Sequence, residues 1–324
     1  MVKKKTVSIN KNDTTKWKND IVESVAYYND WFMKYAPSAY IQTRKESIAQ
    51  VSEIFMATNY FTNVNSQLLK DNPSSLSVLR MATMPPLAMD RLAGLAGVNR
   101  SFVKKLEEGT VPPRMNAAQI EQNIDSLLIV ISQLLDNVLM PWVKGNTTSQ
   151  QQDLLVATSV IADRLSRSQA DPNIRNEQER RQLKIINDYL TSKGYSKIEA
   201  NEVDDIKAMR PGTFSYHVNV PVSVKGEKDV NVSVDVMVKR RGATAEELPI
   251  MIECKSAGDY VNTNKRRKEE AIKMEQLRNN YGKGVEYVLF LCGYFDAGYL
   301  GYEAAEGIDW VWEHRIVDFD KLSL

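Results

Sequence analysis

Hydrophobic residues in the first half of the chain recur mostly three or four positions apart. This spacing aligns apolar side chains along one face of a helix. It predicts helices over residues 15–35, 40–57, 114–139 and 148–168. Proline pairs such as Pro85-Pro86 and Pro112-Pro113 separate these segments, because proline interrupts a helix interior. We therefore expect a mainly helical domain over residues 1–170, with a boundary at Asp171-Pro172.

The pattern changes after this boundary. Residues 173–193 keep helical spacing, and Gly194 is typical of a helix end. Valine then alternates with polar residues over 218–224 and again over 230–238, which predicts two strands. The polar segment 225–229 between them predicts a turn.

Three further elements complete the second half of the chain. The pattern predicts a strand over 249–255, a helix over 264–281 and a buried strand over 285–291. Short connections between the first three strands predict an antiparallel meander. The expected fold class is α+β, with an α/β core in a domain over residues 171–324.

Strand alternation brings three charged residues together. Side chains of successive strand residues point to opposite faces, so the even-numbered valines over 230–238 share one face and Asp235 lies on the other. In the next strand Cys254 faces the core, between Glu253 and Lys255 on the opposite face. We therefore expect Asp235, Glu253 and Lys255 on one face of two neighbouring strands.

Two neighbouring carboxylates favour a metal site, because each raises the cost of ionising the other unless a cation lies between them. Mg²⁺ binds one or two carboxylates, a backbone carbonyl and water, so the predicted ligands are Asp235, Glu253 and the backbone at Cys254. A bound Mg²⁺ lowers the pKa of a coordinated water and offsets charge on a phosphate. Lys255 would orient that water or pair with the phosphate. A bare Glu-x-Lys triplet also occurs on ordinary surface strands, so the surrounding elements decide between the two interpretations.

Composition narrows the class of protein. The chain has 324 residues, 43% hydrophobic, and a net charge of +1, so any nucleic-acid contact depends on local clusters. Two cysteines give no disulfide framework. His217 and His314 have no cysteine or histidine cluster around them for zinc, and the sequence contains no phosphate-loop motif. The N-terminus lacks the apolar core of a signal peptide and no stretch suits a membrane span, so we expect a soluble cytoplasmic protein without a membrane partner.

The order of these elements resembles the PD-(D/E)xK nuclease fold, with Val234 where that motif has proline. Longer strings are similar to type II restriction endonucleases of the XamI group. They are IECKSAGD at 252–259, NTNKRRKEE at 262–270, LFLCGYFD at 289–296 and GYEAAEGIDW at 301–310. The likeness is clearest over the C-terminal half and weaker over residues 84–115.

The resemblance implies an activity and a set of partners. It implies Mg²⁺-dependent cleavage of double-stranded DNA at a short palindrome, with GTCGAC as the sequence associated with the group, leaving 5′-phosphates. A palindromic target implies a homodimer, in which each subunit cuts one strand. It also implies a companion methyltransferase that acts on the same site without needing to bind this protein.

A glutamate of the first helix often joins the metal site in this superfamily. Glu177 and Glu179 are the candidates, and Glu179 is favoured because its neighbours look most like the group. The alternative is a solvated glutamate in a first helical turn, where the helix dipole favours negative charge.

Basic clusters supply candidate DNA contacts. Four basic residues begin the helix that follows the Glu-x-Lys strand, although cations there oppose the helix dipole. They are Lys265, Arg266, Arg267 and Lys268. This placement favours phosphate contact over a solvated face with i,i+4 ion pairs. Arg240 and Arg241, in the loop between two strands, are further candidates.

Residues 90–109 look like a helix-turn-helix of the phage-repressor kind. Gly97 would allow the turn and Val98 would anchor it. Arg100, Ser101 and Lys104 would then face the major groove. The alternative is a helical hairpin that serves packing alone, which leaves the helical domain with a role in DNA recognition or in dimerisation.

Two other functions stay open at this point. A structure-specific or repair nuclease of the same fold would use the same chemistry without a discrete cleavage pattern. A non-catalytic regulator would use the helix-turn-helix alone, and Asp235, Glu253 and Lys255 would then be structural.

Overall fold

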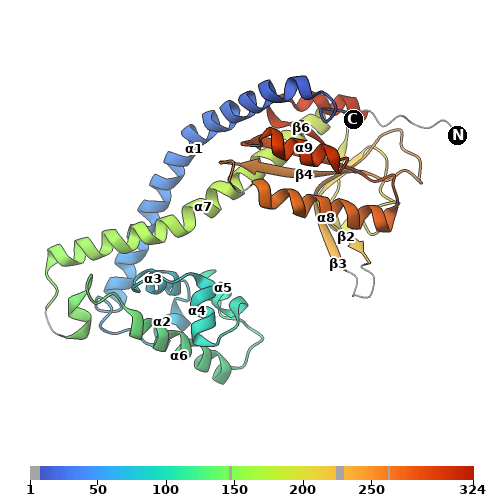
Figure 1. Cartoon of the computed structure of the whole chain (residues 1–324). Coiled ribbons are helices and arrows are strands. Elements are labelled where there is room, and N and C mark those ends of the chain that lie inside the picture. Colours follow the sequence, from blue (N-terminus) through green and yellow to red (C-terminus); the bar gives the residue numbers. More distant parts are fainter. Residues whose placement is uncertain (1–7, 146–147, 224–229, 262) are drawn as a thin grey trace. The chain divides into compact units, whose positions relative to one another are not determined.

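The computed structural model describes residues 8–145, 148–223, 230–261 and 263–324, with the backbone alone at 264–267. The turn predicted at 225–229 lies outside these residues. The chain forms two compact units, Ala36–Ile174 and Met1–Tyr35 with Arg175–Leu324. Two long helices, α1 (Thr14–Ala57) and α7 (Gln151–Ser192), each contribute to both units (Figure 1). The expected combination of a helical N-terminal region with a mixed α+β region is confirmed.

The long helices correct the expected boundaries. Segments 15–35 and 40–57 form one helix that includes Pro37, and α7 continues through Pro172 instead of ending at Asp171. A proline inside a helix removes one backbone hydrogen bond and destabilises the helix by about 3 kcal/mol. Packing of the helix before and after the proline can offset this loss. The first 35 residues also belong to the C-terminal unit. The sequence did not indicate this, because helical spacing predicts a buried face but not the element that packs against it.

The helical unit has its own hydrophobic core. Its further helices are α2 (Ser66–Asp71), α3 (Ser75–Met81), α4 (Met89–Ala96), α5 (Arg100–Glu107), α6 (Ala117–Leu134) and the short η1 (Pro141–Lys144). Apolar residues from all of these elements meet in one buried cluster, including Leu76, Leu92, Phe102 and Ile131. None of the helices in the described ranges is long and apolar enough to cross a membrane.

The other unit is built on a mixed six-stranded sheet. Its strands are β1 (Ser196–Lys197), β2 (Thr213–Val222), β3 (Val230–Lys239), β4 (Ile250–Ala257), β5 (Glu286–Gly293) and β6 (Asp309–Trp312), in that spatial order. The predicted antiparallel meander is confirmed for β2, β3 and β4, whereas β5 and β6 run parallel to β4. The helix α8 (Thr263–Tyr281) connects β4 to β5, and α9 (Ala297–Ala305) connects β5 to β6.

Helices cover both faces of the sheet (Figure 1). Met274 and Leu277 of α8 and Tyr299 of α9 pack on one face. Ile186 of α7 and Phe319 of η3 (Glu313–Leu322) pack on the other. The parallel strands β5 and β6 are therefore almost wholly buried.

The even-numbered valines of β3 do not share one face, contrary to the alternation pattern. Val232 and Val234 join the cluster under α8, whereas Val236 and Val238 join the cluster under α7. The change of face occurs at Asp235. By the strand register His217 lies opposite Asp235, and its φ of 51° breaks the regular extended backbone of β2. A local distortion of both strands therefore ends the alternation at the position of the acid.

Candidate active site

Asp235 lies in the plane between β3 and β4. The regular pairing of these strands extends from Val238 to Val236. At the next residue of β3, the side-chain carboxylate of Asp235 accepts a backbone hydrogen bond from β4. The backbone N–H of Cys254 donates a hydrogen bond of 2.8 Å to Asp235 Oδ2. The side chain of Asp235 is thus held beside the strand that carries Glu253 and Lys255.

Glu253 and Lys255 lie on the α8 face of β4, as alternation predicts. Lys255 Nζ is 3.0 Å from Glu253 Oε1, and the carboxylate is buried. A second lysine, Lys273 of α8, lies 2.5 Å from the same oxygen. Asp235, Glu253 and Lys255 therefore converge, and they are joined by a residue that the sequence patterns did not single out.

Behind Lys255 is a buried acidic network from α8 and β5. Glu270 Oε1 is 2.8 Å from Lys255 Nζ, and Tyr287 Oη donates a 2.6 Å hydrogen bond to Glu270 Oε2. Glu303 of α9 is also buried, and its charge interacts with that of Glu270. Helical spacing contained the signal for Glu270, because it occupies the same stripe of α8 as the buried Met274, four residues on.

Burial and like charges set the electrostatics of the site. Burial, and then the charge of Glu253, raises the pKa of Asp235 to about 6. Burial alone would lower the pKa of Lys255, but the carboxylates of Glu253 and Glu270 outweigh it and hold that pKa above its usual value. Burial, with the charge of Glu270, raises the pKa of Glu303 to about 8, so this side chain is mainly protonated at neutral pH.

The donor set fits a hard divalent cation. Glu253 Oε2 is buried without a hydrogen-bond partner among the described residues, which is costly unless a ligand occupies it. Because the N–H of Cys254 points toward Asp235, its carbonyl lies on the same side of β4. Two carboxylates and a carbonyl are the oxygen ligands that Mg²⁺ prefers. The three carboxylates of Asp235, Glu253 and Glu270 also outnumber the two ammonium groups by one negative charge.

Glu177 and Glu179, the candidate metal ligands in α7, contact other side chains. Glu179 of α7 is 51% exposed, and its Oε1 is 3.8 Å from Nε2 of His217. Glu177 forms an ion pair of 2.6 Å with Arg180. Glu179 thus faces His217, the residue opposite Asp235 by the strand register, and its role as a fourth ligand stays a prediction.

A residue of α7 holds β4 in place. Nε2 of the buried Gln182 donates hydrogen bonds to the carbonyl of Phe290, at 3.2 Å, and to that of Lys255, at 3.4 Å. These contacts link β4 to its neighbour β5 through α7. They were not predicted, because an isolated glutamine in a polar helix resembles a solvated one.

The arginines between β3 and β4 have partners within the protein. Arg240 forms a two-pronged ion pair with Glu286, its side chain is 16% exposed, and its Nε donates to the carbonyl of Leu322. Arg241 lies over the ring of Tyr195, 5.6 Å from its centre. Arg240 therefore fixes the start of β5, and a contact of Arg240 or Arg241 with DNA stays a prediction. A charged loop gives no sign of such internal pairing in the sequence.

The basic run of α8 is described only in part. The side chains of Lys265, Arg266 and Arg267 lie outside the described part of the structure. Lys268 is exposed. Five residues separate the end of β4 from the start of α8, and Glu270, two residues after this run, contacts Lys255.

The segment predicted as a helix-turn-helix consists of α4, a turn and α5. Gly97 has φ +64°, as the turn requires, and Val98 is buried. Arg100 pairs with Asp90, and Lys104 lies 3.6 Å from Glu108, both on the exposed surface. The segment thus contains two helices joined by a turn at Gly97, and its assignment as a DNA-binding helix-turn-helix stays a prediction.

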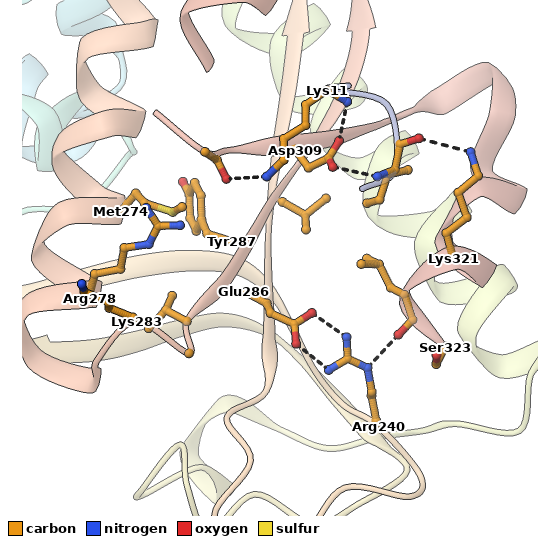
Figure 2. A pocket seen from close by; sticks show the side chains of 16 residues that line it. Lys11, Arg240, Met274, Arg278, Lys283, Glu286, Tyr287, Asp309, Lys321 and Ser323 are labelled. Carbon is orange, nitrogen blue, oxygen red and sulfur yellow. Dashed lines mark hydrogen bonds and ion pairs between the residues drawn. The ribbon is translucent and has the colours of Figure 1, made fainter. Parts of the chain in front are cut away.

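A large cavity lies at the other end of the sheet (Figure 2). It has a volume of about 580 Å³ and opens at the starts of β5 and β6. Its acids are already bound: Glu286 pairs with Arg240, and Asp309 accepts backbone N–H groups of residues 9–11. Because Lys255 lies toward the opposite, carboxyl end of β4, this cavity is separate from the candidate active site.

Asp20, Glu23 and His314 also lie close enough to share a cation. Both oxygens of Asp20 are bound by Arg315, at 2.5 and 2.8 Å. The charge of Asp20 is therefore neutralised within the protein, and this group is an ion-pair cluster.

Comparison with known proteins identifies the family. The sequence profile of the XamI restriction endonuclease family matches residues 59–312. The chain is 43% identical to the type II restriction enzyme SalI of Streptomyces albus G over 312 residues, which cover 96% of this chain and 98% of that enzyme. A solved structure, protein VC1899 from Vibrio cholerae, aligns with 87% of this chain and 55% of its own at 13% identity, but its TM-score of 0.26 carries no structural argument. The chain therefore belongs to the XamI family of type II restriction endonucleases.

Proposed function

We propose that this protein uses Mg²⁺ to hydrolyse double-stranded DNA at a short palindrome, leaving 5′-phosphates, with a PD-(D/E)xK active site. The convergence of Asp235, Glu253 and Lys255 at the junction of β3 and β4 is the observation that carries the proposal. GTCGAC, the sequence associated with the XamI group, is the first target to test, because the chain belongs to that family.

Each residue has a defined task in the proposed reaction. Asp235, Glu253 and the carbonyl of Cys254 hold Mg²⁺, which supplies an acidified water and charge neutralisation when bound. Lys255 orients the water and stabilises negative charge on the phosphate. The attacking water gives up a proton to solvent as its oxygen bonds to phosphorus, the bond from phosphorus to O3′ breaks, and O3′ takes up a proton from solvent.

DNA contacts are proposed on two elements. The N-terminal turn of α8, with Lys265, Arg266, Arg267 and Lys268, would bind backbone phosphates beside the active site. Arg100, Ser101 and Lys104 of α5 would contact base edges. Glu179 is proposed as an accessory acid. Two subunits related by a two-fold axis would present two active sites to the two strands.

Cleavage of plasmid DNA tests the proposal. Supercoiled plasmids with and without a GTCGAC site are incubated with the protein in Mg²⁺ and in EDTA, and the products are separated on a gel. We expect linear DNA only from the plasmid with the site, and only in Mg²⁺. A smear from both plasmids would indicate a nuclease without site specificity. Intact plasmids under all conditions would contradict any nuclease function.

A further inference from the structure

Two ammonium groups approach one oxygen in the candidate active site. Nζ of Lys255 lies 3.0 Å from Glu253 Oε1, and Nζ of Lys273 lies 2.5 Å from it. The proposed reaction assigns a task to Lys255 alone. The role of Lys273 in the site is therefore unassigned.

Lys255 is held on two sides. Besides Glu253 it contacts the fully buried Glu270 at 2.8 Å, and Tyr287 fixes Glu270 with a 2.6 Å hydrogen bond. Its side chain is 17% exposed. Even without the contact to Glu253, Lys255 would remain bound to a buried carboxylate of α8.

Lys273 is held on one side only. Among the residues that the structure describes, its ion-pair partner is Glu253, and its side chain is 29% exposed. It lies one helical turn after Glu270, on the same face of α8. Lys273 is thus both the less restrained and the more accessible of the two ammonium groups.

The charge of the site favours movement of one lysine. The two ammonium groups leave one net negative charge on the carboxylates of Asp235, Glu253 and Glu270. A divalent cation held by Asp235 and Glu253 would turn this into a net positive charge, which would weaken the attraction of Glu253 for a lysine and attract a phosphate. Lys273 has one ion-pair partner among the described residues, so its ammonium group leaves Glu253 at a lower cost in free energy than that of Lys255.

We propose that Lys273 is a second catalytic lysine, whose ammonium moves from Glu253 Oε1 to a non-bridging oxygen of the scissile phosphate. Lys255 stays anchored to Glu270 beside the attacking water. Lys273 then stabilises the charge that builds on the phosphate in the transition state. This inference rests on the proposed nuclease function of the same site.

Three variants test this role. Lys273→Met keeps the aliphatic stem without the charge, Lys273→Arg restores a cation, and Lys283→Met removes a lysine outside the site. For each variant, single-turnover cleavage in Mg²⁺, duplex binding in Ca²⁺ and Mg²⁺ affinity by calorimetry are measured. We expect Lys273→Met to cut about 10²-fold more slowly, with duplex affinity changed less than about threefold and Mg²⁺ bound more tightly. Lys273→Arg should regain part of the rate, and Lys283→Met should match the wild type.

Two results would overturn the inference alone, given a wild type that cuts DNA. One is cleavage by Lys273→Met at the wild-type rate. The other is a parallel loss of rate, duplex binding and thermal stability in both Lys273 variants, which indicates a structural role. A wild type that cuts no DNA in Mg²⁺ would instead overturn the proposed function, and this inference with it.

Discussion

At the scale of single residues, Asp235 has a structural task alongside its proposed chemical one. Its carboxylate accepts the N–H of Cys254, which the neighbouring strand would otherwise bind. Removal of this side chain would leave a buried N–H unpaired, at a cost of about 1–3 kcal/mol. Asparagine keeps the accepting oxygen and removes the charge, so Asp235→Asn separates the two tasks better than Asp235→Ala.

Glu303 gives a prediction about pH and stability. Its pKa is raised to about 8 by burial and by the charges of Glu270 and Glu306, with a smaller opposing effect of Tyr299 and Lys255. A raised pKa means that the folded state binds the proton more tightly, so stability is full below the unfolded pKa near 4.5 and falls as pH rises toward 8. The slope is at most about 1.4 kcal/mol per pH unit.

Glu303→Gln should remove this dependence. The free energy of unfolding, measured by urea denaturation in EDTA from pH 5 to pH 9, should fall less with pH in the variant than in the wild type. Parallel curves for the two proteins would show that Glu303 does not titrate in this range.

The sequence predicted the core of the site and missed its surroundings. Strand alternation is a local property, so it placed Glu253 and Lys255 on one face correctly. Glu270 shares the buried stripe of α8 with Met274, but helical spacing does not show which strands that stripe packs against, and Lys273 lies outside the stripe of buried residues. Their charges also made them resemble an ordinary solvated helix face.

At the scale of elements, the carboxyl ends of β4 and β5 meet at Gly293. A Cβ atom there would lie 2.1 Å from the carbonyl oxygen of Ala257, and the φ of +99° disfavours any side chain. We expect Gly293→Ala to lower the free energy of unfolding by about 2 kcal/mol or more. Gly94→Ala is the matched control, because a Cβ on that helical residue meets nothing within 4 Å, and it should be stabilising by about 0.5–1 kcal/mol. Equal stabilities in urea denaturation would contradict this account of the strand ends.

The recognition role of α5 is also a prediction at this scale. Arg100 and Lys104 form exposed ion pairs, which contribute less than about 1 kcal/mol each. Arg100→Ala with Lys104→Ala should therefore leave the fold intact and weaken binding to a GTCGAC duplex by about tenfold or more. Arg167→Ala, which removes a similar exposed pair with Asp163, is the control. Binding equal to that of the control would indicate that α4 and α5 serve packing alone.

The strands show where element prediction from sequence ends. The limits of β3, β4 and α8 were predicted within two residues, because their apolar spacing is regular. The change of face at Asp235 was not predicted, because it accompanies a left-handed backbone conformation at His217 in the neighbouring strand. Histidine there gives no sequence signal for such a backbone conformation.

At the scale of the whole molecule, the unit that carries the candidate site includes both ends of the chain. Asp309 binds the backbone of residues 9–11, and Trp17 of α1 packs against Trp310. The sequence boundary at residue 170 could not show this, because contacts between distant segments leave no periodic pattern. The two-unit division at residues 35 and 174 emerges only from the folded chain.

The proposed homodimer makes a prediction about strand cleavage. Heterodimers of wild-type and Asp235→Asn subunits, purified through two different affinity tags, contain one competent site. They should convert supercoiled plasmid to nicked circles, because each subunit cuts one strand. Accumulation of linear DNA at the rate of the wild-type dimer would mean that one subunit cuts both strands.

The central claim is that Asp235, Glu253 and Lys255 form the catalytic site of a DNA endonuclease. Single-turnover cleavage of a GTCGAC duplex by wild type, Asp235→Asn and Lys255→Ala, with duplex binding measured in Ca²⁺, tests it most directly. We expect both variants to bind the duplex, since the proposed phosphate and base contacts lie elsewhere, and to cut it at least about 10³-fold more slowly. Cleavage by either variant at the wild-type rate would contradict the assignment of the site.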